Sequence, residues 1–139
     1  MAKHEHMSFT LELVSSPNEI MKVEEFLEGI NAKLRLGDTR YNKLLVATTE
    51  AVNNGIIHGN KRNPKKKVKL TFEVNNASLT VQVQDEGAGV DADALPNPLA
   101  EENLLRENGR GVFLMKSLMD SVEFERLPGG AKVVMKMAL

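Results

Sequence analysis

Two polar side chains stand one helical turn apart in a segment that is otherwise rich in apolar residues. Glu50 and Asn54 lie four residues apart, so on a helix they project from one face, and His58 continues that row by another turn. The amide oxygen of Asn54 could bind a hard cation such as Mg²⁺, which takes few protein oxygens, while Glu50 handles a proton. The same row could instead be the solvated stripe of the helix.

A carboxylate ends the core-facing side of a predicted strand. Alternation places Asp85 on the same side as Val81 and Val83. A buried carboxylate is costly unless a donor meets it, and the exocyclic amine of a purine would be a suitable donor. Gly87 and Gly89 would let the backbone approach the ring closely. The alternative is an Asp-Gly turn that merely ends the strand.

A third segment, Asn108-Gly109-Arg110-Gly111, precedes a predicted apolar helix. Glycines before a helix N-terminus expose backbone N–H groups to an anion, and the helix dipole adds attraction. Arg110 could contribute a phosphate contact of its own. A short Gly-x-Gly is common in loops, so this segment carries weight only in combination with the other two.

The chain order predicts that helices packed on one face of a sheet hold these segments. Alternating apolar residues predict five strands, at about 9–13, 68–74, 79–83, 122–124 and 133–137. Tight turns are expected at Asn75-Asn76 and at 127–130. Helices segregated from a run of neighbouring strands favour the α+β class with a mostly antiparallel sheet.

Three helices are expected between the strands. Ser16-Pro17-Asn18-Glu19 has the pattern of a capping box and opens a first helix that ends near Gly37. Asp38 is expected to cap a second helix from about 39 to 58, and a third should begin at Gly111. Residues 86–110 are predicted to be loop-rich, with a short possible helix at 99–107.

Composition restricts the classes of function. The chain has 139 residues, a net charge of −1 and no cysteine, which excludes disulfides, thiolate metal sites and cysteine nucleophiles. Residues 1–7 are polar and are predicted to form a flexible leader before a single domain at 8–139. No apolar run could span a bilayer, so a cytoplasmic protein without membrane contact is expected. Six basic residues at 61–69 lack interleaved aromatic side chains, which favours a solvated turn over nucleic-acid binding.

The three polar segments, in this order and spacing, resemble the motifs of the GHKL ATPase superfamily, which includes gyrase-type, MutL-type and sensor histidine kinase ATP-binding domains. Residues 50–60 match its N box, and Asp85, Gly87 and Gly89 match its Asp-x-Gly-x-Gly box. Its second glycine box matches Gly109-Arg110-Gly111. The following residues 112–120 look most like the anti-sigma-factor serine/threonine kinase branch, and the resemblance covers nearly the whole chain.

This resemblance implies a two-layer α/β sandwich, the Bergerat ATP-binding fold, with a mixed, mostly antiparallel sheet and helices on one face. It implies ATP and Mg²⁺ as cofactors. Glu50 would be the catalytic base, Asn54 the metal ligand and Asp85 the contact to adenine. The phosphates would face the second glycine box, Gly109, Arg110 and Gly111, with Arg110 also neutralising charge during transfer.

His58 belongs to the N box and so is placed among the nucleotide-binding residues, although a hydrogen-bonded structural histidine is an equal alternative. The chain departs from the wider superfamily after Gly111, where Val112 and Phe113 follow in place of further glycine. The segment 90–108 is also compact for an ATP lid. Both departures bear on the lid more than on nucleotide binding.

Members of this branch bind a sigma factor and phosphorylate a serine or threonine of a small antagonist protein, and the resemblance implies a homodimer. Two other functions remain open. The protein could be a binding module that holds ATP and a partner without phosphorylating anything. It could also be a detached catalytic domain of a sensor histidine kinase, although the sequence lacks the helix pair that would carry a phospho-acceptor histidine.

Overall fold

The computed structural model describes residues 6–87 and 111–139. Within them the element order is β1 (Met7–Val14), η1 (Pro17–Glu19), α1 (Ile20–Leu34), α2 (Asp38–Asn54), η2 (Gly55–Gly59), β2 (Lys67–Val74), β3 (Ser78–Asp85), β4 (Ser121–Leu127) and β5 (Gly130–Ala138). A further helix spans 111–118. The short helix predicted at 99–107 and most of the predicted leader lie outside the described residues, and β1 begins at Met7.

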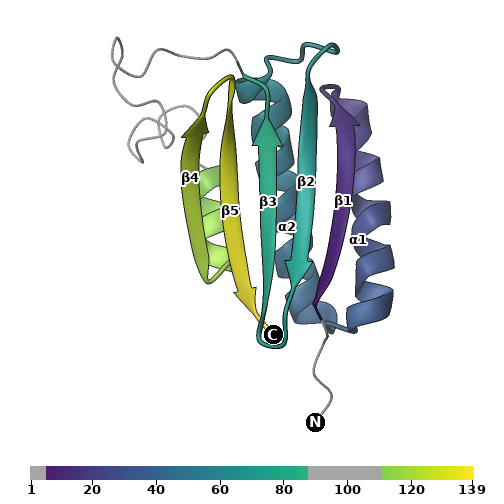
Figure 1. Cartoon of the computed structure of the whole chain (residues 1–139). Coiled ribbons are helices and arrows are strands. Elements are labelled where there is room, and N and C mark those ends of the chain that lie inside the picture. Colours follow the sequence, from purple (N-terminus) through teal and green to yellow (C-terminus); the bar gives the residue numbers. More distant parts are fainter. Residues whose placement is uncertain (1–5, 88–110) are drawn as a thin grey trace.

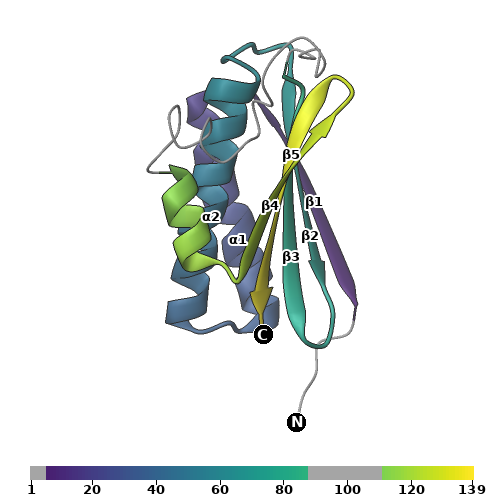
Figure 2. The ribbon, with the colours of Figure 1, turned by 90° about the vertical axis from the view of Figure 1, so that its left-hand side faces the viewer.

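The strands form one five-stranded sheet in the order β1-β2-β3-β5-β4 (Figure 1). All four pairings between these strands are antiparallel, so the predicted mostly antiparallel sheet is confirmed and the described strands contain no parallel pair. The helices lie together on one face of the sheet, which gives the predicted two layers (Figure 2). The class is α+β.

The core lies between these two layers and follows the alternation of the strands. In β2, and in β3 as far as Val83, every second residue is buried, while the residues between them lie on the other face. Helix α1 contributes the predicted apolar stripe, and Val112 and Met115 of the 111–118 helix are also inaccessible. Burial of this kind supplies most of the driving force for folding. Because the strand ends and the helix ends coincide, the polar residues at those ends come together at one edge of the sandwich.

The helices begin differently from the prediction in two places. Ser16 is the N-cap residue of the 3₁₀ turn η1, but its side chain makes no capping hydrogen bond. The carboxylate of Glu19 instead accepts a hydrogen bond from the backbone N–H of Val14 at 3.4 Å. Gly37, with a φ of 85°, occupies the N-cap position of α2, and Asp38 is its first helical residue. The capping role predicted for Asp38 is therefore wrong, because a left-handed conformation is needed there and glycine adopts it at low cost.

Candidate functional site

The polar pair of α2 meets the start of the 111–118 helix. A Cβ placed on Gly111 would lie 2.8 Å from Oε2 of Glu50 and 3.6 Å from both side-chain atoms Nδ2 and Oδ1 of Asn54. The absence of a side chain at Gly111 therefore lets the backbone pass directly beside the carboxylate and the amide. The structure thus brings together two of the three segments that the sequence singled out.

The end of α2 is wider than an α-helix. Residues Gly55–Gly59 form a π-helical turn, in which the backbone N–H of Asn60 bonds to the carbonyl of Gly55 at 2.8 Å. The predicted second helix thus changes its pitch after Asn54, and π turns of this kind occur frequently at functional sites. His58 lies in this turn and is exposed, so its row no longer continues that of Glu50 and Asn54 with regular α-helical spacing. Its role at a nucleotide stays a prediction.

Asp85 sits in a cradle of glycine backbone. A Cβ on Gly59 would overlap the carboxylate of Asp85, and one on Gly87 would lie 3.0 Å from its Oδ1. Oδ1 accepts hydrogen bonds from the backbone N–H groups of Gly87 at 2.9 Å and Ala131 at 3.2 Å. Gly55 completes this packing, since a Cβ there would lie 3.6 Å from Cβ of Asp85.

Burial raises the pKa of the Asp85 carboxyl above its usual range, and the N–H groups of Gly87 and Ala131 and the charge of Lys66 only partly oppose this effect. Desolvation penalises the charged form of a carboxyl, so the carboxylate is held at a cost in free energy. Such perturbed groups cluster at functional sites. The two backbone donors both meet Oδ1, and Oδ2 faces Gly59. A purine amine would fit the acceptor capacity of Oδ2.

The buried side-chain amide of Asn60 forms hydrogen bonds to three separate segments at this edge of the sandwich. Asn60 is 2% exposed, and its Nδ2 donates to Oγ of Ser15 at 2.7 Å and to the carbonyl of Lys67 at 3.0 Å. Its Oδ1 accepts from the backbone N–H of Glu86 at 2.7 Å. Asn60, the residue after the π turn, is therefore linked to Ser15 just after β1, to β2 and to Glu86 just after Asp85. No individual role was predicted for Asn60 within the N-box match at 50–60, although an asparagine directly after an apolar helix end was a usable signal.

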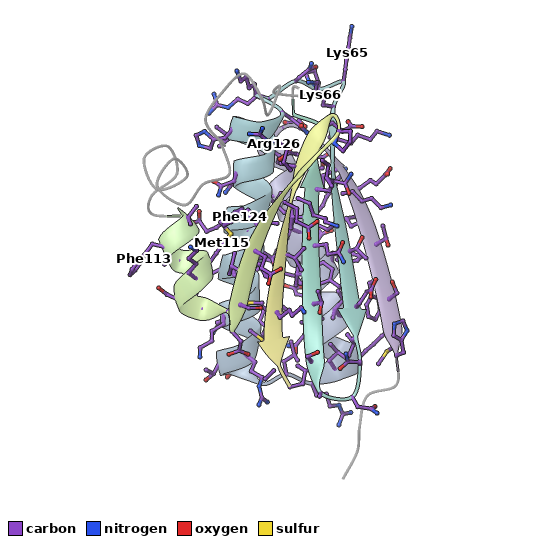
Figure 3. The ribbon with its side chains drawn as sticks, turned by 60° about the vertical axis from the view of Figure 1, so that its left-hand side comes forward. Lys65, Lys66, Phe113, Met115, Phe124 and Arg126 are labelled. Carbon is purple, nitrogen blue, oxygen red and sulfur yellow. The ribbon has the colours of Figure 1, made fainter. Side chains whose placement is uncertain are left out.

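The basic segment 61–67 is a structured turn beside this network. Both the backbone N–H and Oγ of Ser15 donate to the carbonyl of Lys66, at 3.2 and 2.6 Å. Lys61 and Arg62 adopt left-handed conformations with φ of 52° and 59°. Figure 3 shows Lys65 extending away from the body of the protein. The backbone of the turn thus supports the site, while its charged side chains are mostly exposed, in agreement with a solvated turn.

Asn108, Gly89, Gly109 and Arg110 of the predicted site lie outside the described residues. The residues that are described fit a nucleotide with a hard cation: a carboxylate and an amide oxygen stand beside Gly111, and glycines leave room at the partly buried Asp85. No group of three or more His, Asp or Glu side chains within 6–87 and 111–139 is placed to hold a metal. A magnesium ion would therefore depend on Asn54 together with phosphate and water oxygens. No helix in the described ranges is long and apolar enough to cross a membrane.

Comparison with known proteins agrees with this geometry. Residues 13–137 match the histidine kinase-like ATPase domain family, and the chain belongs to this family. Its curated relatives include an anti-sigma F factor of Clostridium beijerinckii, 33% identical over 68% of this chain and 68% of the relative. Another is the serine-protein kinase RsbW of Listeria innocua, 26% identical over 94% of this chain and 87% of the relative.

Solved structures support the fold. A Mycobacterium tuberculosis protein with RsbU and RsbW domains matches 94% of this chain and 31% of its own length, with a TM-score of 0.69 and 13% identity. The catalytic domain of the histidine kinase ThkA matches 94% of this chain and 97% of its own, with a TM-score of 0.56 and 12% identity. The predicted kinase-like ATPase fold is confirmed, and similarity to anti-sigma factors and RsbW kinases defines the branch.

Proposed function

We propose that this protein is an ATP-dependent serine/threonine kinase of the anti-sigma-factor type. It would transfer a phosphoryl group from ATP to a hydroxyl of a small antagonist protein and would also bind a sigma factor. The names of the relatives support this proposal. The observation that carries it is the position of Gly111 against Glu50 and Asn54, at the same edge as Asp85 in its glycine cradle.

In this proposal the bound MgATP supplies the transferable phosphoryl group and the cation that neutralises its charge. The side chains divide the remaining work between binding and proton transfer. Asp85 accepts a hydrogen bond from the base, and its burial makes that acceptor selective because a ligand without a donor would leave the carboxylate unpaired. The amide oxygen of Asn54 would hold the metal. The phosphates would lie at Gly111, where a helix N-terminus favours negative charge, and Arg110 would contribute a contact to them.

Glu50 has the position of a general base. Its Oε2 lies beside the Gly111 backbone, so its carboxylate stands at the helix N-terminus where the phosphates would lie. It would accept or orient the proton of the incoming serine or threonine hydroxyl, and help of this kind typically contributes about 10²- to 10⁴-fold to a rate. The rest of the acceleration in phosphoryl transfer comes from positioning and charge neutralisation.

The test is phosphoryl transfer from labelled ATP to candidate antagonist proteins, with Glu50→Gln as the variant. Glutamine keeps the shape of the side chain, so ADP should still stabilise the variant against heat, while transfer should fall by about 10²- to 10⁴-fold. Equal transfer by the variant would refute the base. Nucleotide binding without transfer by the wild type would instead support a non-catalytic binding module.

The chemical stability of the product separates this proposal from a sensor histidine kinase domain. A phosphoserine or phosphothreonine survives acid, whereas phosphohistidine does not, so an acid-labile product would contradict the proposed acceptor. We also propose a homodimer and a cytoplasmic location, in keeping with an anti-sigma factor. Sedimentation of the purified chain with and without ADP measures the first of these directly.

A further inference from the structure

Arg126 is a charged side chain on the core-facing side of β4. It pairs with Ala131 of β5, which in turn pairs with Asp85 of β3, so these three residues form one cross-strand row. The neighbouring row is Phe124, Val133 and Val83, and both valines are buried. Because residues two apart in a strand share a face, Arg126 faces the helix layer, as Asp85 does.

The guanidinium of Arg126 is incompletely satisfied. Its Nη2 is closed off from solvent and has no hydrogen-bond partner, a condition shared in the described ranges only by the neutral hydroxyl of Thr48. The adjacent carboxylate of Glu125 belongs to the opposite face of the strand and pairs with Lys132 at 3.3 Å. A buried cationic donor without an acceptor is unfavourable, so its presence calls for an explanation such as an acceptor on a ligand.

The length of this row suits a nucleotide base placed between Asp85 and Arg126. Asp85 and Arg126 are separated by two strand spacings, roughly 10 Å between Cα atoms, with only the methyl group of Ala131 between them. An acceptor therefore stands at one end of this cross-strand row and a donor at the other. Figure 3 shows Arg126 toward the end of the sheet where Lys66 also lies, above Phe124.

We propose that Arg126 donates a hydrogen bond to an acceptor on the base or sugar of the bound nucleotide, opposite the Asp85 contact. This inference rests on the proposed nucleotide-binding function. The row of Asp85 and Arg126 belongs to the sheet, whereas Glu50, Asn54 and Gly111, which would face metal and phosphates, belong to the helix layer. Arg126, which lies in the same cross-strand row as Asp85, therefore recognises the nucleoside and not the phosphates.

The experiment compares Arg126→Met with the wild type in calorimetric titrations of adenosine and of ADP. Methionine fills similar space without any donor. We expect the affinity for both ligands to fall by the same factor, about 10- to 100-fold, because a charge-assisted hydrogen bond is lost in each complex. Arg40→Met is the matched control, since Arg40 is exposed in the first turn of α2 and its replacement should leave both affinities unchanged.

The outcomes are distinct. Unchanged affinities in Arg126→Met would overturn the contact, and a loss for ADP alone would show a phosphate contact and overturn the nucleoside assignment. Without ligand, the unfolding midpoint of Arg126→Met should equal or exceed that of the wild type, because an unpaired buried donor is removed. A large loss of stability would show a structural role and would also overturn the proposal. Failure of the wild type to bind ADP would instead refute the nucleotide-binding function itself.

Discussion

Replacement of Gly111 by alanine tests the position of the Glu50 carboxylate, the proposed catalytic base, without replacing Glu50 itself. The new Cβ would lie 2.8 Å from Oε2 of Glu50, a separation that real Cβ atoms essentially never show. Ordinary contact begins near 3.4 Å, so the carboxylate has to retreat by about 0.6 Å. The distance to the Asn54 amide, 3.6 Å, is already ordinary contact, so Asn54, the proposed metal ligand, need not move.

The expected magnitudes follow from this geometry. A misplacement of about 1 Å at a reacting group can cost on the order of 10²-fold in rate, so Gly111→Ala should slow phosphoryl transfer by about 10- to 100-fold. The flexible end of Glu50 can move at little cost, and alanine favours a helix over glycine by up to about 1 kcal/mol. The free energy of unfolding should therefore change by less than about 1 kcal/mol.

The assay is single-turnover transfer from labelled ATP to the antagonist, combined with ADP-dependent thermal stabilisation. At an ADP concentration about 100 times the Kd, binding adds about 2.7 kcal/mol, which corresponds to a rise in melting temperature of roughly 10 °C. Gly111→Ala should retain most of that rise. Gly29→Ala is the matched control, because Gly29 is an exposed position of α1 with nothing within 4 Å of the new Cβ.

The control should raise stability by about 0.5–1 kcal/mol and leave transfer unchanged. If Gly111→Ala transferred phosphate at the wild-type rate with its ADP-dependent stabilisation intact, the location of the Glu50 carboxylate would not matter. Its assignment as base would then be wrong. If ADP-dependent stabilisation and transfer were lost together, Gly111 would act through the phosphates and not through Glu50.

Two further predictions concern the same edge of the sheet. Burial raises the pKa of Asp85, so its contribution to the stability of the nucleotide-free fold is complete at acid pH and is lost as pH rises through that raised pKa. The variant Asp85→Asn should therefore unfold at a higher temperature than the wild type at neutral pH, and its melting temperature should depend less on pH. The same variant should lose the stabilisation by ADP. Asn60→Ala removes three hydrogen bonds of a buried side chain and should cost about 2–4 kcal/mol in urea unfolding. Asn76→Ala in the exposed β2–β3 turn should instead change stability by less than about 0.5 kcal/mol. A lower melting temperature for Asp85→Asn at neutral pH, or equal costs for the two alanine variants, would contradict these arguments.

Much of the fold was predictable because strand alternation and helix periodicity are strong signals in this chain. The predicted hairpin at Asn75-Asn76 is confirmed, since Oδ1 of Asn75 accepts hydrogen bonds from the backbone N–H groups of Ala77 and Ser78. The turn after β4 is also confirmed, with Gly129 at a φ of 75°. Local patterns of this kind are read directly from residue type and spacing.

Features that depend on contacts between distant segments were not predictable. The sequence indicated a single helix through His58, but the π turn arises where the end of α2 meets Asp85 and Val68, and no local pattern marks that change of pitch. Asn60 has partners 45 residues before it and 26 after it. Strand alternation places Arg126 on the same face as Phe124, but a charged residue near a strand end does not by itself indicate a function. Only the structure shows that its buried Nη2 has no hydrogen-bond partner.

Apart from the buried hydroxyl of Thr48, which has no hydrogen-bond partner, the unfavourable features described above lie at one edge of the described structure, and this favours a function there. The partly buried Asp85 carboxylate, the π turn and the unpaired nitrogen of Arg126 all occur where the strands β3 and β4 and the helix α2 end. The remainder of the core is apolar apart from a few buried polar residues. A chain selected for stability alone would place an apolar residue at position 85, as it does at Val83 on the same face of β3. Retention of the carboxylate therefore favours a ligand that compensates its partial burial. Binding of that ligand should therefore protect the amides of this edge from hydrogen exchange more than those of the paired strands β1 and β2.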